Sequence, residues 1–309
     1  MSCSIDFGAV LSESDIRENA PLGAVTTFRC GGRAKRLLSP KNTAELRAVI
    51  RLLNEAEEPY FVLGRGSNIL VSDEGYDGTV VSLREHMNGV TRISGTELRA
   101  EAGAMLPELA REALSFGLSG LEFASGIPGS VGGGLVMNAG AYGSELKNVV
   151  TGAELLFPDG SVRRLSNEEL QLSYRHSVIP ELKAAVLSAD FRLEPGNTEA
   201  IREKMEDLNS RRREKQPLNY GSAGSTFKRP PGYFAGKLIE DAGLKGLRIG
   251  DAAVSEKHAG FVINHGNACA SDVYRVICHV QRTVKERFGV RLEREVILLG
   301  SFPQDIENE

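Results

Sequence analysis

The sequence predicts a fold of mixed helices and strands, of the α/β or α+β class. Apolar residues recur at helical spacing in some segments, whereas other segments are short apolar runs typical of buried strands, and the two kinds are interleaved. No internal repeat is visible. With 309 residues, the chain exceeds one ordinary core and is long enough for two or three domains of about 100–150 residues each.

The first predicted helix begins at Thr43, whose side chain can cap it. Its buried stripe follows an i, i+3, i+4, i+7 pattern and consists of Leu46, Val49, Ile50 and Leu53. Pro59 closes this segment, and residues 60–63 form a short buried strand that runs into a glycine-containing loop. The next expected elements are strands at 79–83 and 98–102 and a helix at 106–116 that ends at Gly117.

A turn sequence marks the middle of the chain. Pro158-Asp159-Gly160 lies between two apolar runs, so residues 153–157 and 161–165 are predicted to form a hairpin. Ser166 and Glu169 have the spacing of a capping box and predict a helix start. The remaining expected elements, after a boundary at 194–197, are a helix carrying Ile201, Met205 and Leu208, a long helix capped by Ser271 and ended by Gly289, and a last strand at 290–299.

Composition excludes several classes of protein. The chain has 37 basic and 41 acidic residues and a net charge of −4, so it lacks the cationic surface of a general nucleic-acid binder. No apolar run reaches the ~18–20 residues of a membrane span, and residues 1–10 lack the basic cluster of a secretory signal. The cysteines at 3, 30, 269 and 278 form no CxxC pair or zinc spacing, which is typical of unpaired thiols in a reducing compartment.

Glycine is unusually frequent, with 34 residues, and it gathers in two loops. Gly64-Arg-Gly-Ser-Asn follows the strand at 60–63, and a second loop, Gly126-Ile-Pro-Gly-Ser-Val-Gly-Gly-Gly134, lies further along. Glycines allow backbone N–H groups to approach an anion closely. A tight turn would explain either loop alone, but a pyrophosphate held between the two would explain both.

The common nucleotide-binding and hydrolase motifs are absent from the sequence. The segment at Gly64 has Ile69 where a Rossmann fingerprint needs its third glycine. The sequence contains no GxxxxGK[ST], GxSxG or HExxH motif. The five histidines, at 86, 176, 258, 265 and 279, show no ligand spacing, so no metal site is expected.

Several polar residues have both an ordinary and a functional interpretation. Arg211 and Lys215 lie at i and i+4 on one helix face, where they form either a solvated helix end or a phosphate contact. Arg175 lies in Ser-Tyr-Arg-His-Ser, and Ser225 lies in a loop of small residues. Glu295 shares a strand face with Ile297 and Leu299, which is unusual for a carboxylate. The residues alone leave these alternatives open.

Six motifs together resemble those of the UDP-N-acetylenolpyruvoylglucosamine reductase family. They are GRGSNIL at 64–70, ASGIPGSVGGG at 124–134, NAGAYG at 138–143, SYRHS at 173–177, GSTF at 224–227 and LEREVIL at 292–298. Each motif is weak alone, but six in order are specific, and the resemblance covers nearly the whole chain, from TTFR at 26–29 to Glu295.

The resemblance implies a three-domain α+β flavoprotein. It implies an FAD-binding fold of the vanillyl-alcohol-oxidase type together with an α/β substrate-binding domain. By this comparison, residues 1–70, joined by 292–309, and residues 71–195 form two FAD-binding subdomains, and residues 196–291 form the substrate-binding domain.

The resemblance also implies a reaction and a cellular role. FAD would be bound non-covalently and reduced by NADPH, and a hydride would then pass to the β-carbon of UDP-N-acetylenolpyruvoylglucosamine to give UDP-N-acetylmuramate. Ser225 would protonate the α-carbon, while Arg175 and Glu295 would stabilise the intermediate. The implied setting is peptidoglycan precursor synthesis in the cytoplasm, serving cell-wall biogenesis, cell shape and cell division, with no obligate protein partner.

The remaining site residues follow from the two loops and from the resemblance. For FAD they are Gly64, Arg65, Gly66, Ser67, Asn68, Ile69, Ser125, Gly126, Ile127, Pro128, Gly129, Gly133 and Gly140. For the substrate they are Tyr142, Arg211, Lys215, Arg229 and His258.

The chain resembles the shorter type of the family, which lacks the tyrosine-bearing loop that closes over the substrate in the longer type. Arg229 stands where many relatives have asparagine. Two alternative functions stay open. Another FAD-dependent oxidase or dehydrogenase of the same fold would keep the glycine loops but not the Ser225 loop or Glu295. A non-catalytic nucleotide-sugar-binding protein would bind no flavin.

Overall fold

A computed structural model describes residues 5–303, which form two compact units. The first comprises the chain up to Glu18, Arg36–Arg65 and Gly78–Arg212, and the second comprises Asn19–Lys35, Gly66–Asp77 and the chain from Arg213 onward. Each unit has a hydrophobic core of its own. Residues 1–4 and 304–309, and with them Cys3 and the outer ends of the predicted FAD-binding segments, lie outside the described residues.

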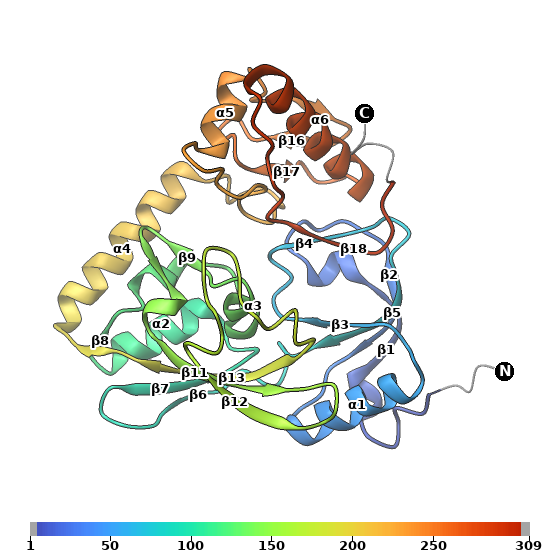
Figure 1. Cartoon of the computed structure of the whole chain (residues 1–309), viewed down its shortest axis with the longest axis vertical. Helices are drawn as coiled ribbons and strands as arrows, with labels where there is room; N and C mark the ends of the chain where they lie inside the picture. The colour runs from blue at the N-terminus through green and yellow to red at the C-terminus, as the bar shows by residue number, and fades with distance from the viewer. Residues whose placement is uncertain (1–4, 304–309) are drawn as a thin grey trace. The chain divides into compact units, whose positions relative to one another are not determined.

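The first unit is built around a five-stranded antiparallel sheet (Figure 1). In spatial order its strands are β12 (Val162–Ser166), β11 (Val150–Leu156), β13 (Ala185–Arg192), β7 (Glu97–Glu101) and β6 (Val90–Arg92). The helices α2 (Leu106–Ser115) and α3 (Val131–Val136) lie over one face of the sheet (Figure 1). The central strand β13 is buried up to its last residue.

A second sheet has four strands. Within three of these strands, the chain leaves one unit and enters the other. The strands, in spatial order, are β1 (Ile16–Pro21), β2 (Arg33–Leu38), β5 (Tyr76–Ser82) and β3 (Tyr60–Leu63). β3 and β5 run parallel, with Tyr60 opposite Thr79. The helix α1 (Thr43–Glu55) precedes β3 and buries its apolar stripe in the core of the first unit.

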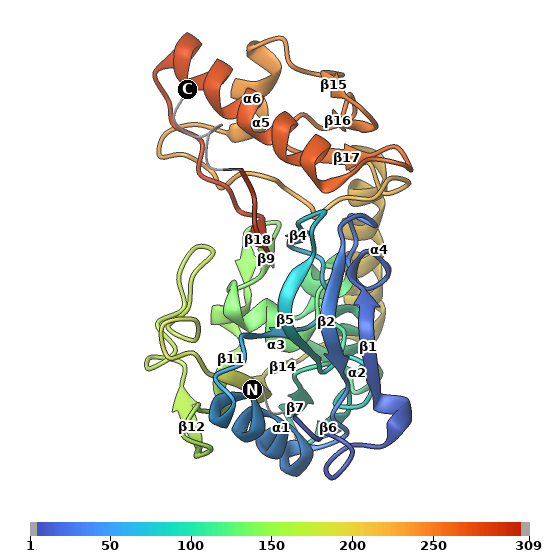
Figure 2. The same cartoon turned by 90° about the vertical axis from the view of Figure 1, so that its right-hand side faces the viewer.

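The second unit contains a three-stranded antiparallel sheet that packs against the long helix α6 (Figure 2). Its elements are β15 (Arg248–Ile249), β16 (Ala252–Val254), β17 (Val262–Asn264), α5 (Ala235–Asp241) and α6 (Ala270–Phe288). In the same unit, β4 (Ile69–Val71) pairs in parallel with β18 (Ile297–Leu299), so the first glycine-containing loop and the C-terminal segment lie side by side.

The other elements are short, apart from α4 (Thr198–Lys215). They are the pairs β8 (Leu118–Ser119) with β14 (Glu194–Pro195) and β9 (Gly140–Ala141) with β10 (Ser144–Glu145), and 3₁₀ turns at Glu13–Asp15, Leu22–Val25, Glu122–Gly126 and Leu146–Asn148. In the part of the chain that is described, no helix combines the length and the apolar character that crossing a membrane requires.

The structure confirms the α+β class and most predicted elements. The strand at 60–63 is present as predicted, the turn at 158–160 joins the antiparallel strands β11 and β12, and the predicted helices at 106–116 and after residue 197 are present. The long C-terminal helix ends at Gly289, whose φ of +68° is the left-handed conformation expected of a glycine after a helix.

Two predicted helix starts are wrong for local reasons. α1 is capped by Asn42 instead of Thr43, because the Asn42 Oδ1 accepts a hydrogen bond from the Glu45 N–H at 3.0 Å. Ser166 and Glu169 do exchange the two hydrogen bonds of a capping box, at 2.7 and 3.3 Å, but they close a turn and no helix follows.

The predicted last strand is wrong in extent, since only Ile297–Leu299 is a strand. Before it, Arg294 bridges to Phe227, and the Glu295 N–H donates to the Thr226 carbonyl at 2.9 Å. The backbone of residues 294–295 therefore pairs with the loop that contains Ser225 before the chain joins β4.

The start of α6 is also corrected. Ser271 lies inside the helix, and the N-cap residue Cys269 makes no side-chain cap. The Asp73 carboxylate replaces it from another part of the chain, accepting from the N–H groups of Ala270 (2.7 Å) and Ser271 (2.8 Å) and from the Ser271 Oγ (2.6 Å). Burial disfavours the charged carboxylate, but these hydrogen bonds outweigh it and lower the pKa of Asp73.

We expect Asp73→Ala to lower the free energy of unfolding by about 1 kcal/mol at neutral pH, because α6 loses its only described cap. Since the pKa of Asp73 is lowered from 3.8, the stabilisation is complete above that pH and is lost as the pH falls through the lower folded value. Urea unfolding followed by circular dichroism at a series of pH values measures both effects. The neighbouring exposed residue provides the control, Glu74→Ala. Equal stability of the two variants at pH 7 would refute the cap.

Candidate active site

The two glycine-containing loops come together in the first unit. Gly64 follows β3, and a Cβ added there would overlap the Oγ of Ser130 and lie 3.7 Å from the Gly133 nitrogen. The Ser130 Oγ in turn accepts a hydrogen bond from the Gly133 N–H at 3.3 Å and so caps α3. The backbone at residue 64 therefore lies directly against the second loop.

Gly66 lies in the first loop and belongs to the second unit. Two features of its backbone exclude a side chain. Its φ is +68°, and a Cβ would overlap the Val25 carbonyl oxygen and lie 3.0 Å from the Thr26 Cα. Beside it, Thr26 is only 5% exposed, and its Oγ1 has no hydrogen-bond partner among the described residues. A buried hydroxyl without a partner costs about 1–3 kcal/mol, which a ligand atom would recover.

Arg65 adds a cation to the same loop. Burial lowers the pKa of its guanidinium, and the positive charge of Arg84 lowers it further. No carboxylate among residues 5–303 pairs with it. Within the first unit, the close backbone at Gly64 and the desolvated Arg65 are groups that suit a diphosphate such as that of FAD. Within the second unit, the buried Thr26 hydroxyl beside Gly66 is another such group.

Two of the predicted FAD residues further along the chain, Ser125 and Gly140, form hydrogen bonds within the first unit. The Ser125 Oγ donates to the Glu122 carbonyl at 2.8 Å and accepts from the Asn209 Nδ2 at 3.1 Å. The Gly140 carbonyl accepts from the Arg175 Nη2 at 3.5 Å. Ile127, Pro128 and Gly129 connect Ser125 to the Ser130 cap.

Arg175 stands at the tip of a strained turn. Ser173 and His176 bridge across it, with two backbone hydrogen bonds of 3.1 Å, and Arg175 has a φ of +54°. Left-handed backbone in a residue other than glycine costs of the order of 1 kcal/mol and is concentrated at functional sites. The guanidinium lies 5.2 Å from the centre of the Tyr174 ring and near Gly140, so its position is well defined.

Ser225 and Glu295 are neighbours in the second unit. Thr226 is held on three sides: its N–H donates to the Gly260 carbonyl (2.8 Å), its Oγ1 accepts from the Val262 N–H (3.0 Å), and its carbonyl accepts from the Glu295 N–H. The Glu295 carbonyl also accepts from the Asn68 Nδ2 at 2.9 Å. Ser225 and Glu295 are both half-buried. The structure thus joins these two predicted residues to the end of the first loop, while Arg175 belongs to the first unit.

Three of the predicted substrate-binding residues already have partners within the protein. Arg211 is exposed and pairs with Asp207 at 2.8 Å, so a phosphate would compete with that carboxylate. The Arg229 guanidinium lies 3.9 Å from the centre of the Phe234 ring. Burial lowers the pKa of His258 from 6.5, so this imidazole is neutral at pH 7, and its Nδ1 accepts from the Gly260 N–H.

The other two predicted substrate-binding residues are Tyr142 and Lys215. The Tyr142 hydroxyl donates to the Leu208 carbonyl at 3.1 Å, and Lys215 is exposed at the end of α4.

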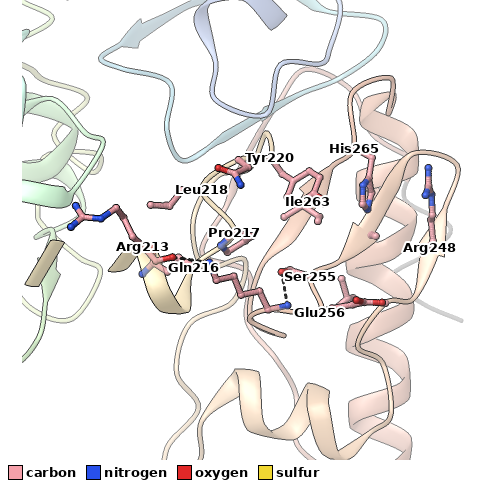
Figure 3. Close-up of a pocket in the computed structure, with 15 residues that line it drawn as sticks. Arg213, Gln216, Pro217, Leu218, Tyr220, Arg248, Ser255, Glu256, Ile263 and His265 are labelled. Atoms are coloured by element: carbon pink, nitrogen blue, oxygen red, sulfur yellow. Dashed lines mark hydrogen bonds between the residues drawn. The ribbon is translucent and has the colours of Figure 1, made fainter. Parts of the chain in front are cut away.

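The second unit also contains a cavity of about 530 Å³ (Figure 3). The residues that line it include Ala253 and Ile263, which belong to a small apolar cluster separate from the one that packs on α6. Tyr220 and His265 lie edge to face above it, at 4.8 Å. Figure 3 shows the Arg213 guanidinium pointing away from these rings. None of the predicted substrate residues lines this cavity.

Comparisons with known proteins agree with the two loops and the C-terminal unit. Residues 34–166 match the family described as an FAD binding domain, and residues 216–299 match the C-terminal domain of UDP-N-acetylenolpyruvoylglucosamine reductase.

Whole-chain relatives carry the same description. The chain is 52% identical over 291 residues to the UDP-N-acetylenolpyruvoylglucosamine reductase of Caldanaerobacter subterraneus subsp. tengcongensis, covering 94% of this chain and 96% of the relative. It is 46% identical to that of Clostridioides difficile, covering 94% and 95%. The crystal structure of the Thermus caldophilus reductase is similar, with a TM-score of 0.77, 36% identity and coverage of 92% of this chain and 100% of that one.

Proposed function

The chain belongs to the UDP-N-acetylenolpyruvoylglucosamine reductase family and is an FAD-dependent oxidoreductase, and we propose that it takes its electrons from NADPH. Its reaction is the reduction of UDP-N-acetylenolpyruvoylglucosamine in peptidoglycan synthesis, and we place it in the cytoplasm. The observation that supports this best is the presence of both matched parts in one chain, with the two glycine loops in contact at Gly64 and Ser130. A non-catalytic sugar-binding protein would have no need of that contact.

The residues of the loops are proposed to hold FAD. Gly64, Gly66 and the segment from Ser125 to Gly133 would face its diphosphate, with Arg65 supplying positive charge. When bound, FAD accepts a hydride from the nicotinamide and delivers one to the β-carbon of the enolpyruvyl group.

Three side chains are proposed to act on the enolpyruvyl group. Hydride addition at the β-carbon leaves an electron pair on the α-carbon and its carboxylate. Arg175 stabilises this charge, because its guanidinium is already positioned by Gly140 and Tyr174 before the reaction. Glu295 acts as the second stabilising group. The Ser225 hydroxyl delivers the proton that completes the lactyl ether, and because a hydroxyl is a weak acid it can do so only from a fixed position.

The proposed function predicts a defined product. The purified protein, supplied with NADPH and UDP-N-acetylenolpyruvoylglucosamine, should form a nucleotide sugar heavier by two hydrogens, identified by mass spectrometry as UDP-N-acetylmuramate. The reaction without NADPH is the control. Protein that contains FAD and oxidises NADPH but leaves the nucleotide sugar unchanged would identify another flavin enzyme of this fold.

Ser225→Ala tests the proton donor. Reduction of the flavin by NADPH should be nearly unchanged, whereas formation of product from the reduced enzyme should slow by about 10²–10⁴-fold, the usual worth of a general acid. Stopped-flow absorbance separates the two steps. Ser222→Ala is the matched control, since Ser222 lies in the same loop and is held through its backbone by Thr27. If both steps slow equally in Ser225→Ala, the serine is structural.

A further inference from the structure

Arg212 occupies a different face of α4 from its neighbour Arg211. A Cβ added at Gly126 would lie 3.1 Å from the Arg212 Cδ and 3.7 Å from its Nη1. One turn earlier on the helix, the Asn209 Nδ2 donates to the Ser125 Oγ at 3.1 Å. This face of α4 therefore packs directly on the second glycine loop and brings a guanidinium to it.

The charge on Arg212 is uncompensated. The side chain is half-buried, yet it forms no hydrogen bond or ion pair with any of residues 5–303. Burial lowers the pKa of Arg212, and the nearby Tyr142 opposes this only in part. Other arginines of the first unit have carboxylates: Arg36 pairs with Glu58, and Arg211 pairs with Asp207. A desolvated cation is costly unless an anion accompanies it.

The loop restricts which anion fits. Gly126 offers backbone without a side chain, and the adjoining Ser125 hydroxyl is already held by Glu122 and Asn209. A planar guanidinium donates two parallel hydrogen bonds to phosphate oxygens, and no carboxylate of this unit reaches it. We propose that Arg212 binds the diphosphate of a nucleotide at the Gly126 loop, a role that rests on the proposed function.

Three molecules of that function carry a diphosphate: FAD, the nucleotide sugar and NADPH. One set of variants distinguishes them. The variants are Arg212→Met and Arg212→Lys, with Arg202→Met as the control, because Arg202 lies on the same helix, is exposed and pairs with Glu199. Flavin dissociation is followed by the rise in flavin fluorescence when holoenzyme is diluted. Binding of the nucleotide sugar is followed by the change in flavin absorbance of the oxidised holoenzyme. Binding of NADPH is followed by the NADPH concentration that half-saturates the rate of flavin reduction in a stopped-flow experiment.

Arg212→Met should weaken one of these three affinities by about 10- to 100-fold, the worth of a charge-assisted hydrogen bond. Arg212→Lys should weaken the same affinity less, since a point charge replaces the planar fork. Arg202→Met should change none of them. Loss of flavin identifies FAD as the ligand. Weaker sugar binding with full flavin identifies the substrate, and weaker NADPH binding with full flavin identifies NADPH.

Unchanged affinities for all three molecules in Arg212→Met would overturn the inference. A slower turnover with all three affinities intact would also overturn it, because Arg212 would then act on the reacting atoms. The flavin measurement needs no turnover. If the wild-type protein fails to reduce the nucleotide sugar while Arg212→Met still loses flavin, the proposed function fails and the inference stands. Because Arg212 forms no ion pair with the described residues, Arg212→Met should fold. If Arg212→Met does not fold, the affinities of Arg212→Lys, compared with those of the wild-type protein, test the inference.

Discussion

The candidate site depends on a close approach of backbone that only glycine allows. At position 64 a single methyl group would overlap the Ser130 hydroxyl, and Ser130 cannot turn away without releasing the cap of α3. The second loop therefore packs against the end of β3 through a contact to which Gly64 contributes only backbone atoms. At Gly66 the constraint is doubled, since both the positive φ and the Val25 carbonyl exclude a side chain. The contacts with Ser130 and Val25 therefore explain why glycine stands at both positions.

The arginines beside these loops differ from several arginines elsewhere in the chain. The protein carries a net charge of −4, and arginines such as Arg36, Arg99 and Arg211 are paired with carboxylates. Arg65 and Arg212, which border the two loops, are half-buried and pair with none in the described part of the chain. Overall charge therefore says little about the ligand, whereas the placement of unpaired cations beside glycine indicates an oxyanion.

The sequence predicted what depends on local pattern and missed what depends on distant residues. The strand at Tyr60, the hairpin at Gly160 and the helix end at Gly289 are determined by neighbouring residues, and all three are confirmed. The cap of α6 is not determined by neighbouring residues, because Asp73 lies far from this helix in the chain. The last strand was overextended because alternation cannot reveal that residues 294–295 pair with the loop around Thr226.

The candidate site divides in the same way. The glycine loops were visible as a composition and as motifs, and the structure brings them together. Thr26 and Arg212 were not identified, because a missing hydrogen-bond partner or counter-ion is a property of the folded chain. Thr26 did fall within the TTFR motif at 26–29, and Arg212 within the basic run beside Arg211, but nothing in those patterns separated them from Thr27 or Arg213.

The most direct test of the central claim is the absorbance spectrum of the purified protein under anaerobic conditions. The account predicts a yellow protein whose flavin absorbance is bleached by NADPH and restored by UDP-N-acetylenolpyruvoylglucosamine in the absence of oxygen. Restoration requires that one bound cofactor passes electrons from the nicotinamide to the enolpyruvyl group. A flavin that bleaches but stays reduced after the nucleotide sugar is added would contradict the account.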